Sequence, residues 1–239
     1  MTRSKYRGLL NRHILPTFGE TLLTEITPAQ VSTWYASLFN RLPATAAGAY
    51  RLLATICNTA VREDVLERSP CRVEGGATEH SPERPILSRS EVQLAVDAVP
   101  AQYRCALLLA AWCQMRRSEV LALQRGDVDL VTGSVKVSRA WVITQEGVAS
   151  IERPKSNAGY RTLFTPPLVA EALKTHLNNF VAEPPTAWLF PTTRGSWPLS
   201  HRTFSRVWER ARDTAGHPEL RFHDLRHSGL VWFALLRIT

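Results

Sequence analysis

Three short stretches of the sequence carry residue types that can bind and activate phosphate groups. In the first, Arg116 lies between a strongly apolar segment, expected to be a buried helix ending at Met115, and a second helix expected to open at Ser118. Its side chain can therefore reach into a cleft. Glu119, three residues on, can hold the guanidinium by a hydrogen bond. By itself the pair is equally compatible with an ordinary surface salt bridge.

The second stretch, residues 151–163, places Lys155 in a turn between two expected strands. Pro154, Asn157 and Gly159 are residues typical of turns. A lysine at a hairpin tip can act on a ligand as hydrogen-bond donor or general acid. Most lysines in loops are simply solvated, so this signal is weak alone.

The third stretch is HDLRH, residues 223–227. In a helix starting at Phe222, His223 and Arg226 would share one face and converge on one phosphate. Asp224 near the helix start would suit the helix dipole. An H-x-x-R pattern also arises by chance in an arginine-rich chain.

Taken together, the three stretches give three cations and an imidazole in one domain. Such a set suits a phosphodiester passing through a pentacoordinate, doubly charged state. Two guanidiniums would bind the non-bridging oxygens, and a lysine or histidine would protonate the leaving oxygen. This chemistry requires no metal.

The overall composition agrees with an anionic partner. The chain has 239 residues, a formal net charge of +8 and a sequence pI of about 9.8. Arginine supplies most of the positive charge, which favours phosphate contacts, although charge alone leaves a merely basic surface open. Apolar residues make up 44% and charged residues 21%, which indicates a globular chain and excludes a disordered one.

The four cysteines show no CxxC spacing, so we expect reduced thiols and no structural zinc site. No apolar run reaches the length of about 18 residues that suits a membrane span. The first ten residues show no signal-peptide pattern. We therefore expect a cytoplasmic protein without membrane association.

The pattern of apolar residues predicts a mainly α fold with a small antiparallel β-sheet. Residues 1–72 read as a helical domain: a first helix over 5–15, closed by Pro16 and Gly19, then a helix capped by Thr27 and Gln30, then a third. Residues 73–85 hold two glycines and two prolines and read as an exposed linker.

Residues 86–239 read as a second domain. It is expected to begin with a helix capped by Ser88 and Glu91, followed by a buried apolar helix over 103–113. Strands are expected over 134–144, 147–156 and 160–166, and helices over 166–181 and 200–216, the last capped by Ser200 and ended near Gly216.

The order of these motifs resembles the tyrosine recombinases, and more narrowly the phage integrases of actinobacterial type, over about residues 6–228. Residues 13–38 are similar to the helical, SAM-like core-binding domain of that family. MRRSEVLALQRGDVDL (115–130) is similar to its first arginine box, RPKSNAGYRTL (153–163) to its lysine hairpin, and RFHDLRHS (221–228) to its second box.

The resemblance implies catalytic roles for Arg116, Lys155, His223 and Arg226, with Lys155 as general acid and Glu119 in support. In such enzymes a tyrosine attacks the DNA phosphate, a 3′-phosphotyrosyl bond forms and a 5′-hydroxyl leaves. Strand exchange takes place in a tetramer on two DNA sites, with no cofactor or metal. The implied partners are double-stranded DNA and either further copies or a full-length integrase, in a bacterial cell and encoded by a prophage or mobile element.

The sequence departs from the family at both ends. Only 13 residues follow Arg226, without the family's downstream box or its nucleophilic tyrosine, so we expect an incomplete catalytic domain. The tail after Ser228 lacks helical alternation, and we expect a reading frame shifted or cut near Gly229, with a short natural ending as the alternative. The chain opens at the first core-binding helix, so high-affinity arm-site binding is not expected.

Four functions remain open on this basis. The chain is a recombinase by descent that binds DNA but forms no covalent adduct alone, or it accepts the tyrosine of a full-length partner in trans. A third interpretation is a DNA-binding protein that occupies integrase core sites without chemistry. The fourth is an unrelated basic helical protein, which the agreement of composition and motif order disfavours.

Overall fold

The computed structural model describes residues 2–78, 85–143, 147–154, 159–193, 195 and 197–235. The chain forms two compact units, Met1–Glu83 and Arg84–Thr239. In the part of the chain that is described, no helix is long and apolar enough to cross a membrane.

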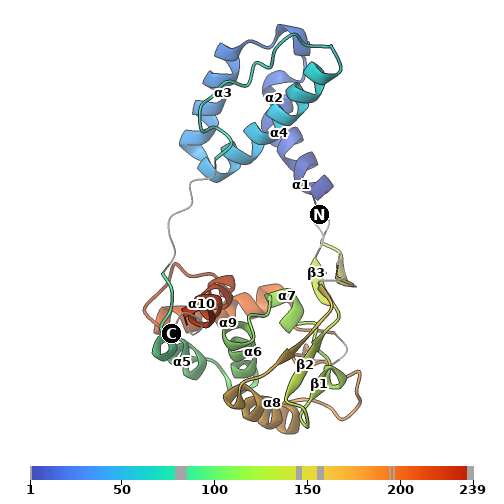
Figure 1. Ribbon diagram of the computed structural model, residues 1–239, viewed down its shortest axis with the longest axis vertical. Helices are drawn as coiled ribbons and strands as arrows, with labels where there is room; N and C mark the ends of the chain where they lie inside the picture. Colours follow the sequence, from blue (N-terminus) through green and yellow to red (C-terminus); the bar gives the residue numbers. More distant parts are fainter. Residues whose placement is uncertain are drawn as a thin grey trace. The chain divides into compact units, whose positions relative to one another are not determined.

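The N-terminal unit is helical (Figure 1). Its elements are α1 (Thr2–Leu9), a π-helical turn (Leu10–Ile14), α2 (Leu15–Phe18), a 3-10 turn (Leu23–Glu25), α3 (Pro28–Arg41) and α4 (Pro43–Arg62). The predicted capping box is present at α3, where Thr27 accepts a hydrogen bond from the Gln30 backbone and the Gln30 side chain accepts one from Thr27. The core of this unit is formed by buried apolar side chains of all its main helices, Val31, Leu53 and Cys57 among them.

The sequence predicts that the first helix ends before Pro16, but in the structure the helical stretch continues to Phe18. Pro16 lies in the first turn of α2, directly after the π-helical turn, a position at which proline is tolerated. Phe18 packs edge-on against Trp34 with ring centroids 5.5 Å apart. Burial of Phe18 thus outweighs the helix-ending tendency of the proline.

Residues 73–78, which the sequence assigns to an exposed linker, are fixed to α4. The Tyr50 hydroxyl accepts a hydrogen bond from the Val73 N–H at 2.8 Å and donates one to the Val73 carbonyl at 3.3 Å. Arg51 donates to the Ala77 carbonyl at 2.8 Å. This segment therefore belongs to the folded N-terminal unit.

The second unit combines helices with short antiparallel strands (Figure 1). Its elements are α5 (Arg89–Ala98), α6 (Ala101–Trp112), α7 (Arg117–Val120), a 3-10 turn (Arg125–Asp127), β1 (Val128–Asp129), β2 (Ser134–Val137), β3 (Ala140–Ile143), β4 (Ala149–Glu152), β5 (Arg161–Phe164), α8 (Pro167–Phe180), α9 (His201–Thr214) and α10 (Phe222–Leu235). The strands form one sheet in the order β1-β2-β5 and a separate β3-β4 pair. The mainly α fold with small antiparallel sheets is confirmed.

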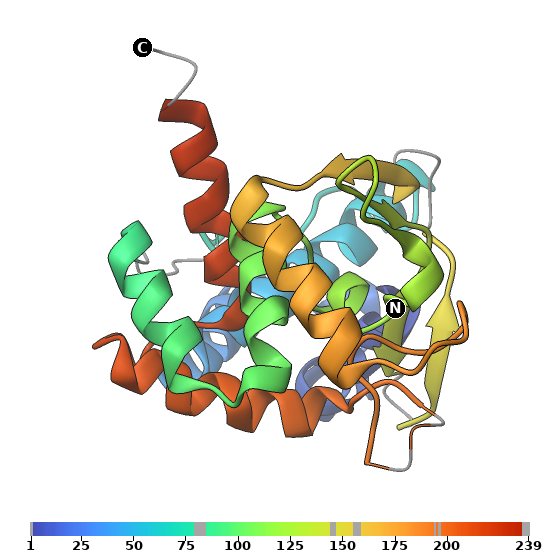
Figure 2. The ribbon, with the colours of Figure 1, turned by 90° about the horizontal axis from the view of Figure 1, so that it is seen from below.

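Helix α6 forms the centre of this unit. It is apolar nearly all round, as predicted, and Leu107, Leu109 and Ala110 have no exposed surface. It packs against α5, α8 and α10. Figure 2 shows these helices gathered around it, with α9 running beneath them. The candidate site begins at the C-terminal end of this helix.

Helix α10 includes most of the tail that the sequence reads as non-helical. On its packed side, the Ser228 hydroxyl accepts a hydrogen bond from the Leu87 N–H, and the Trp232 indole donates to the Leu87 carbonyl, both at 3.0 Å. Leu230, Phe233 and Leu235 are exposed. Because both the packed and the exposed side of α10 carry apolar residues, the sequence shows no alternation of polar and apolar positions. The end of α10 extends beyond its neighbours (Figure 2).

Candidate active site

Arg116 lies at the turn between α6 and α7. The chain leaves α6 through Gln114, whose positive φ of 47° is unusual for a residue with a side chain. The Arg116 backbone N–H and its guanidinium Nη1 each donate to Glu119, both at 2.9 Å. The predicted contact between the two residues is therefore present. Glu119 is held in place because it also caps α7, and its hydrogen bond to Nη1 orients the Arg116 side chain. This side chain is 54% exposed.

Arg161, at the start of β5, is a site residue that the sequence analysis missed. Its Nη1 donates to Glu119 Oε1 at 3.1 Å and its Nη2 donates to Glu119 Oε2 at 2.8 Å. The signal available in the sequence was an arginine directly after the lysine turn. Nothing in the chain order indicates that this arginine reaches a carboxylate 42 residues away.

The two arginines fix the ionisation of Glu119. Burial alone would raise the pKa of this carboxyl group, but hydrogen bonds from Arg161 and Arg116 outweigh it and lower the pKa to about 2. Glu119 is thus a carboxylate at neutral pH, and it is shared between two cations.

His223 and Arg226 lie on α10, one turn apart as predicted. The guanidinium of Arg226 donates to the carbonyl of Gln114, in the turn that leads to Arg116. Gly229 allows α10 to approach so closely, because a methyl group in its place would overlap the carbonyl of Ala111 at the end of α6. The sequence at 223–229 therefore places Arg226 beside the first arginine box.

The pKa directions show that these groups act on one another. Burial lowers the pKa of Arg226, and the nearby Arg116 lowers it further. Burial likewise lowers the pKa of His223, with further lowering by Arg226 and Arg116 that the carboxylate of Asp224 partly offsets. His223 is therefore a neutral imidazole at neutral pH, able to accept a proton. The structure brings Arg116, His223 and Arg226 together, whereas Lys155 lies outside the described residues.

The site has more positive than negative charge. Arg116, Arg161 and Arg226 lie near the buried carboxylate of Glu119, and three cations around this one carboxylate leave a cationic surface suited to a phosphate group. Across the described ranges, no group of three His, Cys, Asp or Glu side chains is placed to hold a metal ion.

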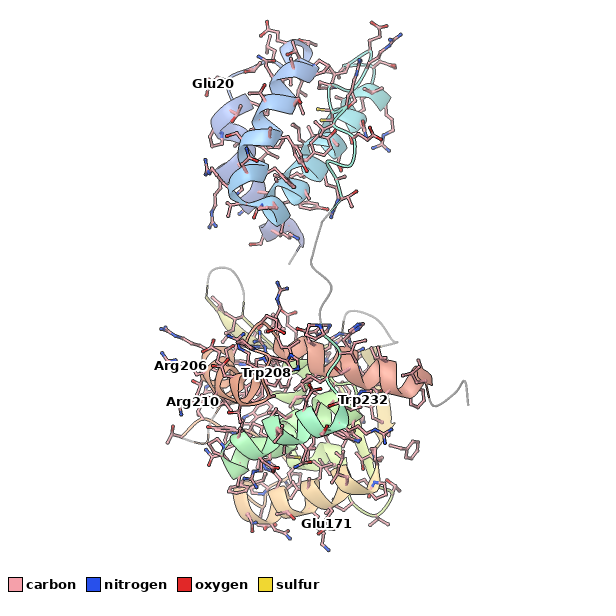
Figure 3. All side chains as sticks on the ribbon, turned by 90° about the vertical axis from the view of Figure 1, so that its left-hand side faces the viewer. Glu20, Glu171, Arg206, Trp208, Arg210 and Trp232 are labelled. Carbon is pink, nitrogen blue, oxygen red and sulfur yellow. The ribbon has the colours of Figure 1, made fainter. Side chains whose placement is uncertain are left out.

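A second basic feature runs along α9. Three exposed arginines occupy every fourth position, so they form a stripe with a rise of about 6 Å from one to the next: Arg202, Arg206 and Arg210. Figure 3 shows Arg206 and Arg210 on the outer side of the helix. The opposite face is buried, with Phe204 and Trp208 packed edge-on against Phe222 at the start of α10.

The five tyrosines are divided between the two units. Tyr35 and Tyr50 pack on each other in the N-terminal unit, and Tyr6 is exposed there. Tyr103 packs against the core of the second unit. Tyr160 directly precedes β5, and its side chain is exposed.

Known proteins agree with this description. Residues 85–234 match the Phage integrase family, and residues 1–39 match the phage integrase N-terminal SAM-like domain. The chain is 39% identical over 96% of its length to a prophage phiRv2 integrase of Mycobacterium tuberculosis, and 32% identical over 98% to the integrase of Mycobacterium phage L5. It spans 62% and 63% of those two relatives.

Solved structures show the same fold at low sequence identity. The Tn1549 transposon integrase in complex with a circular intermediate DNA superposes with a TM-score of 0.81 at 16% identity, covering 98% of this chain and 80% of that one. A lambda integrase dimer bound to a COC' core site gives 0.66 at 20% identity, covering 95% and 80%. With the match over residues 85–234, which exceeds half of its length, the chain belongs to the phage integrase family.

Proposed function

We propose that this chain binds double-stranded DNA and takes part in site-specific recombination. The observation that carries the proposal is the convergence of Arg116, Arg226 and neutral His223 at the end of α6. The mycobacterial relatives named integrases and the DNA-bound structures of similar fold support it.

In this proposal the two guanidiniums of Arg116 and Arg226 bind the non-bridging oxygens of the scissile phosphate. Their charge stabilises the pentacoordinate state, in which negative charge accumulates on those oxygens. Lys155 protonates the 5′-oxygen as it leaves. His223, uncharged at neutral pH, accepts the proton of the attacking hydroxyl.

DNA contacts extend beyond the reacting phosphate. The arginine stripe of α9 suits a row of phosphates, because its members are spaced by about 6 Å along the helix axis. The net charge of +8 favours the same partner. Affinity for DNA should therefore fall steeply as the salt concentration rises.

We further propose that the 239 residues form no covalent DNA adduct by themselves and that a full-length integrase supplies the nucleophilic tyrosine in trans. The tyrosines support this, because none occupies the position of the family's nucleophile in the sequence and Tyr103 is packed against the core of the second unit. A second candidate function is occupation of integrase core sites without chemistry, which the same observation allows.

A nicked duplex that traps phosphotyrosyl intermediates tests these proposals. It is built on the DNA sequence that the chain selects from a random pool. The chain alone should shift this duplex without forming a covalent band. Added to a full-length integrase whose own arginine site is inactivated, it should restore the band if it acts in trans. No restoration favours site occupation, and a covalent band from the chain alone contradicts the proposal.

A further inference from the structure

Glu119 has a full set of hydrogen-bond donors, and all of them come from two arginines. Oε1 accepts from Arg116 Nη1 at 2.9 Å and from Arg161 Nη1 at 3.1 Å. Oε2 accepts from the Arg116 backbone at 2.9 Å and from Arg161 Nη2 at 2.8 Å. Two positive charges therefore share one negative charge.

The two arginines do not contribute equally. Arg161 grips both carboxylate oxygens with two guanidinium nitrogens, the forked geometry of the stronger arginine–carboxylate pairs. Arg116 gives only one guanidinium nitrogen, and its side chain is 54% exposed, against 24% for Arg161. The remaining donors of Arg116 are thus open to a further anion, while Arg161 is committed to Glu119.

We infer that Arg161 is a positioning residue that neutralises Glu119, so that Arg116 keeps its charge for the phosphate. The inference rests on the proposed function, in which Arg116 binds the scissile phosphate. Arg116, Arg161 and Glu119 together carry one net positive charge. Without Arg161 the net charge of Arg116 and Glu119 is zero. Glu119 can then bind the Arg116 guanidinium with both oxygens, which makes Arg116 unavailable to DNA.

The same fork also connects two elements of the site. Arg161 is the first residue of β5 and is paired with Val137 of β2 in the sheet. Its bond to Glu119 therefore anchors the start of β5 at the turn that carries Arg116. Loss of the fork acts on the site without removing any group that touches the phosphate.

Salt-dependent binding to a random-sequence DNA duplex, followed by fluorescence anisotropy, tests this inference. The slope of log affinity against log salt is negative, and Arg116→Gln should reduce its magnitude by about 0.9, the value for one phosphate contact. Arg161→Gln should reduce the magnitude by the same amount. Combining Arg161→Gln with Glu119→Gln should restore the wild-type slope, because Arg116 then has no carboxylate to neutralise it.

Arg139→Gln is the matched control. Arg139 also pairs with a buried carboxylate, Asp127, and the side chains of the two pairs are similarly exposed: 27% and 6% here, 24% and 8% for Arg161 and Glu119. This variant should keep the wild-type slope. Arg161→Lys, which retains the charge without the fork, should lose less than Arg161→Gln and covers the case in which the glutamine variant does not fold.

The outcomes separate the inference from the function on which it rests. If Arg116→Gln lowers the slope but Arg161→Gln does not, the inference is wrong and the proposed function stands. If the double variant stays as weak as Arg161→Gln, Arg161 acts by another route, such as a direct phosphate contact, and the inference is again wrong. If Arg116→Gln itself leaves the slope unchanged, the proposed function fails.

Discussion

Two buried carboxylates of the second unit occupy nearly the same local motif with opposite results. Glu119 caps α7 and Asp127 caps the 3-10 turn Arg125–Asp127, and each accepts a hydrogen bond from the backbone N–H three residues before it. Each also binds an arginine from a distant segment, Arg161 in one case and Arg139 in the other.

The difference lies in the residue three positions before each acid. At the first motif it is Arg116, a second cation, and the pKa of Glu119 falls to about 2. At the second it is Gln124, which is neutral, and burial raises the pKa of Asp127 although Arg139 and Lys136 act to lower it. Glu119 is hydrogen-bonded to two arginine side chains and Asp127 to one, so the first motif leaves positive charge at the surface.

Removal of the two carboxylates should give the largest contrast. Glu119→Ala leaves the half-buried Arg161 and the exposed Arg116 without their counter-charge and should lower the free energy of unfolding by about 3–5 kcal/mol. Asp127→Ala frees only one arginine and one backbone N–H, so we expect a loss of about 1–3 kcal/mol. Urea denaturation measures both, and an equal loss would remove the distinction between the motifs.

The stability contributed by the two carboxylates should depend on pH in opposite directions. The pKa of Glu119 is lower in the folded chain than its ordinary 4.5, so its ionisation stabilises the fold above about pH 4.5 and this contribution is lost as the pH falls toward 2. The full shift corresponds to about 3 kcal/mol. Glu119→Gln should abolish this pH dependence.

Asp127 has a raised pKa, so its contribution runs in the other direction: it favours the folded state at low pH and is lost as the pH rises. Because asparagine resembles the protonated acid, Asp127→Asn should have nearly the same stability as the wild type at low pH and differ from it most at neutral pH. The measurement is thermal melting of each variant across the acid range. Parallel pH profiles for the two variants would contradict the assignment of opposite shifts.

A third capping acid, Glu91 of α5, gives the smallest effect. It pairs with His217 at 2.9 Å near the surface, and the hydrogen bond that His217 donates to this carboxylate raises the pKa of His217. The pair therefore stabilises the fold below about pH 6 and is lost as the pH rises through the raised pKa. His217→Gln should cost at most about 1 kcal/mol at low pH and nothing at high pH. A constant difference across the range would rule out the charged pair.

The sequence predicts the local half of each motif well and the distant half poorly. The capping boxes at Thr27 and Ser88 and the Arg116–Glu119 contact involve residues three positions apart, whose geometry a helix start dictates. The fork from Arg161 and the bond from Arg139 to Asp127 depend on how the strands return to the helices. Chain order carries no signal for that pairing.

The same distinction explains the errors at the two ends. Pro16 ends a helix by local rules, but Phe18 gains a place against Trp34 and the helix continues. The segment after Ser228 shows no amphipathic period, yet Trp232 and Gly229 find partners on Leu87 and α6 that only the tertiary structure supplies.

The central claim is that Arg116 and Arg226 bind one DNA phosphate. The salt dependence of duplex binding by the double variant Arg116→Gln/Arg226→Gln, with Arg139→Gln as control, tests it most directly. Loss of both cations from a phosphate site should reduce the magnitude of this negative slope by between about 1 and 2, while the control keeps the wild-type value. An unchanged slope in a double variant that is folded would contradict the claim.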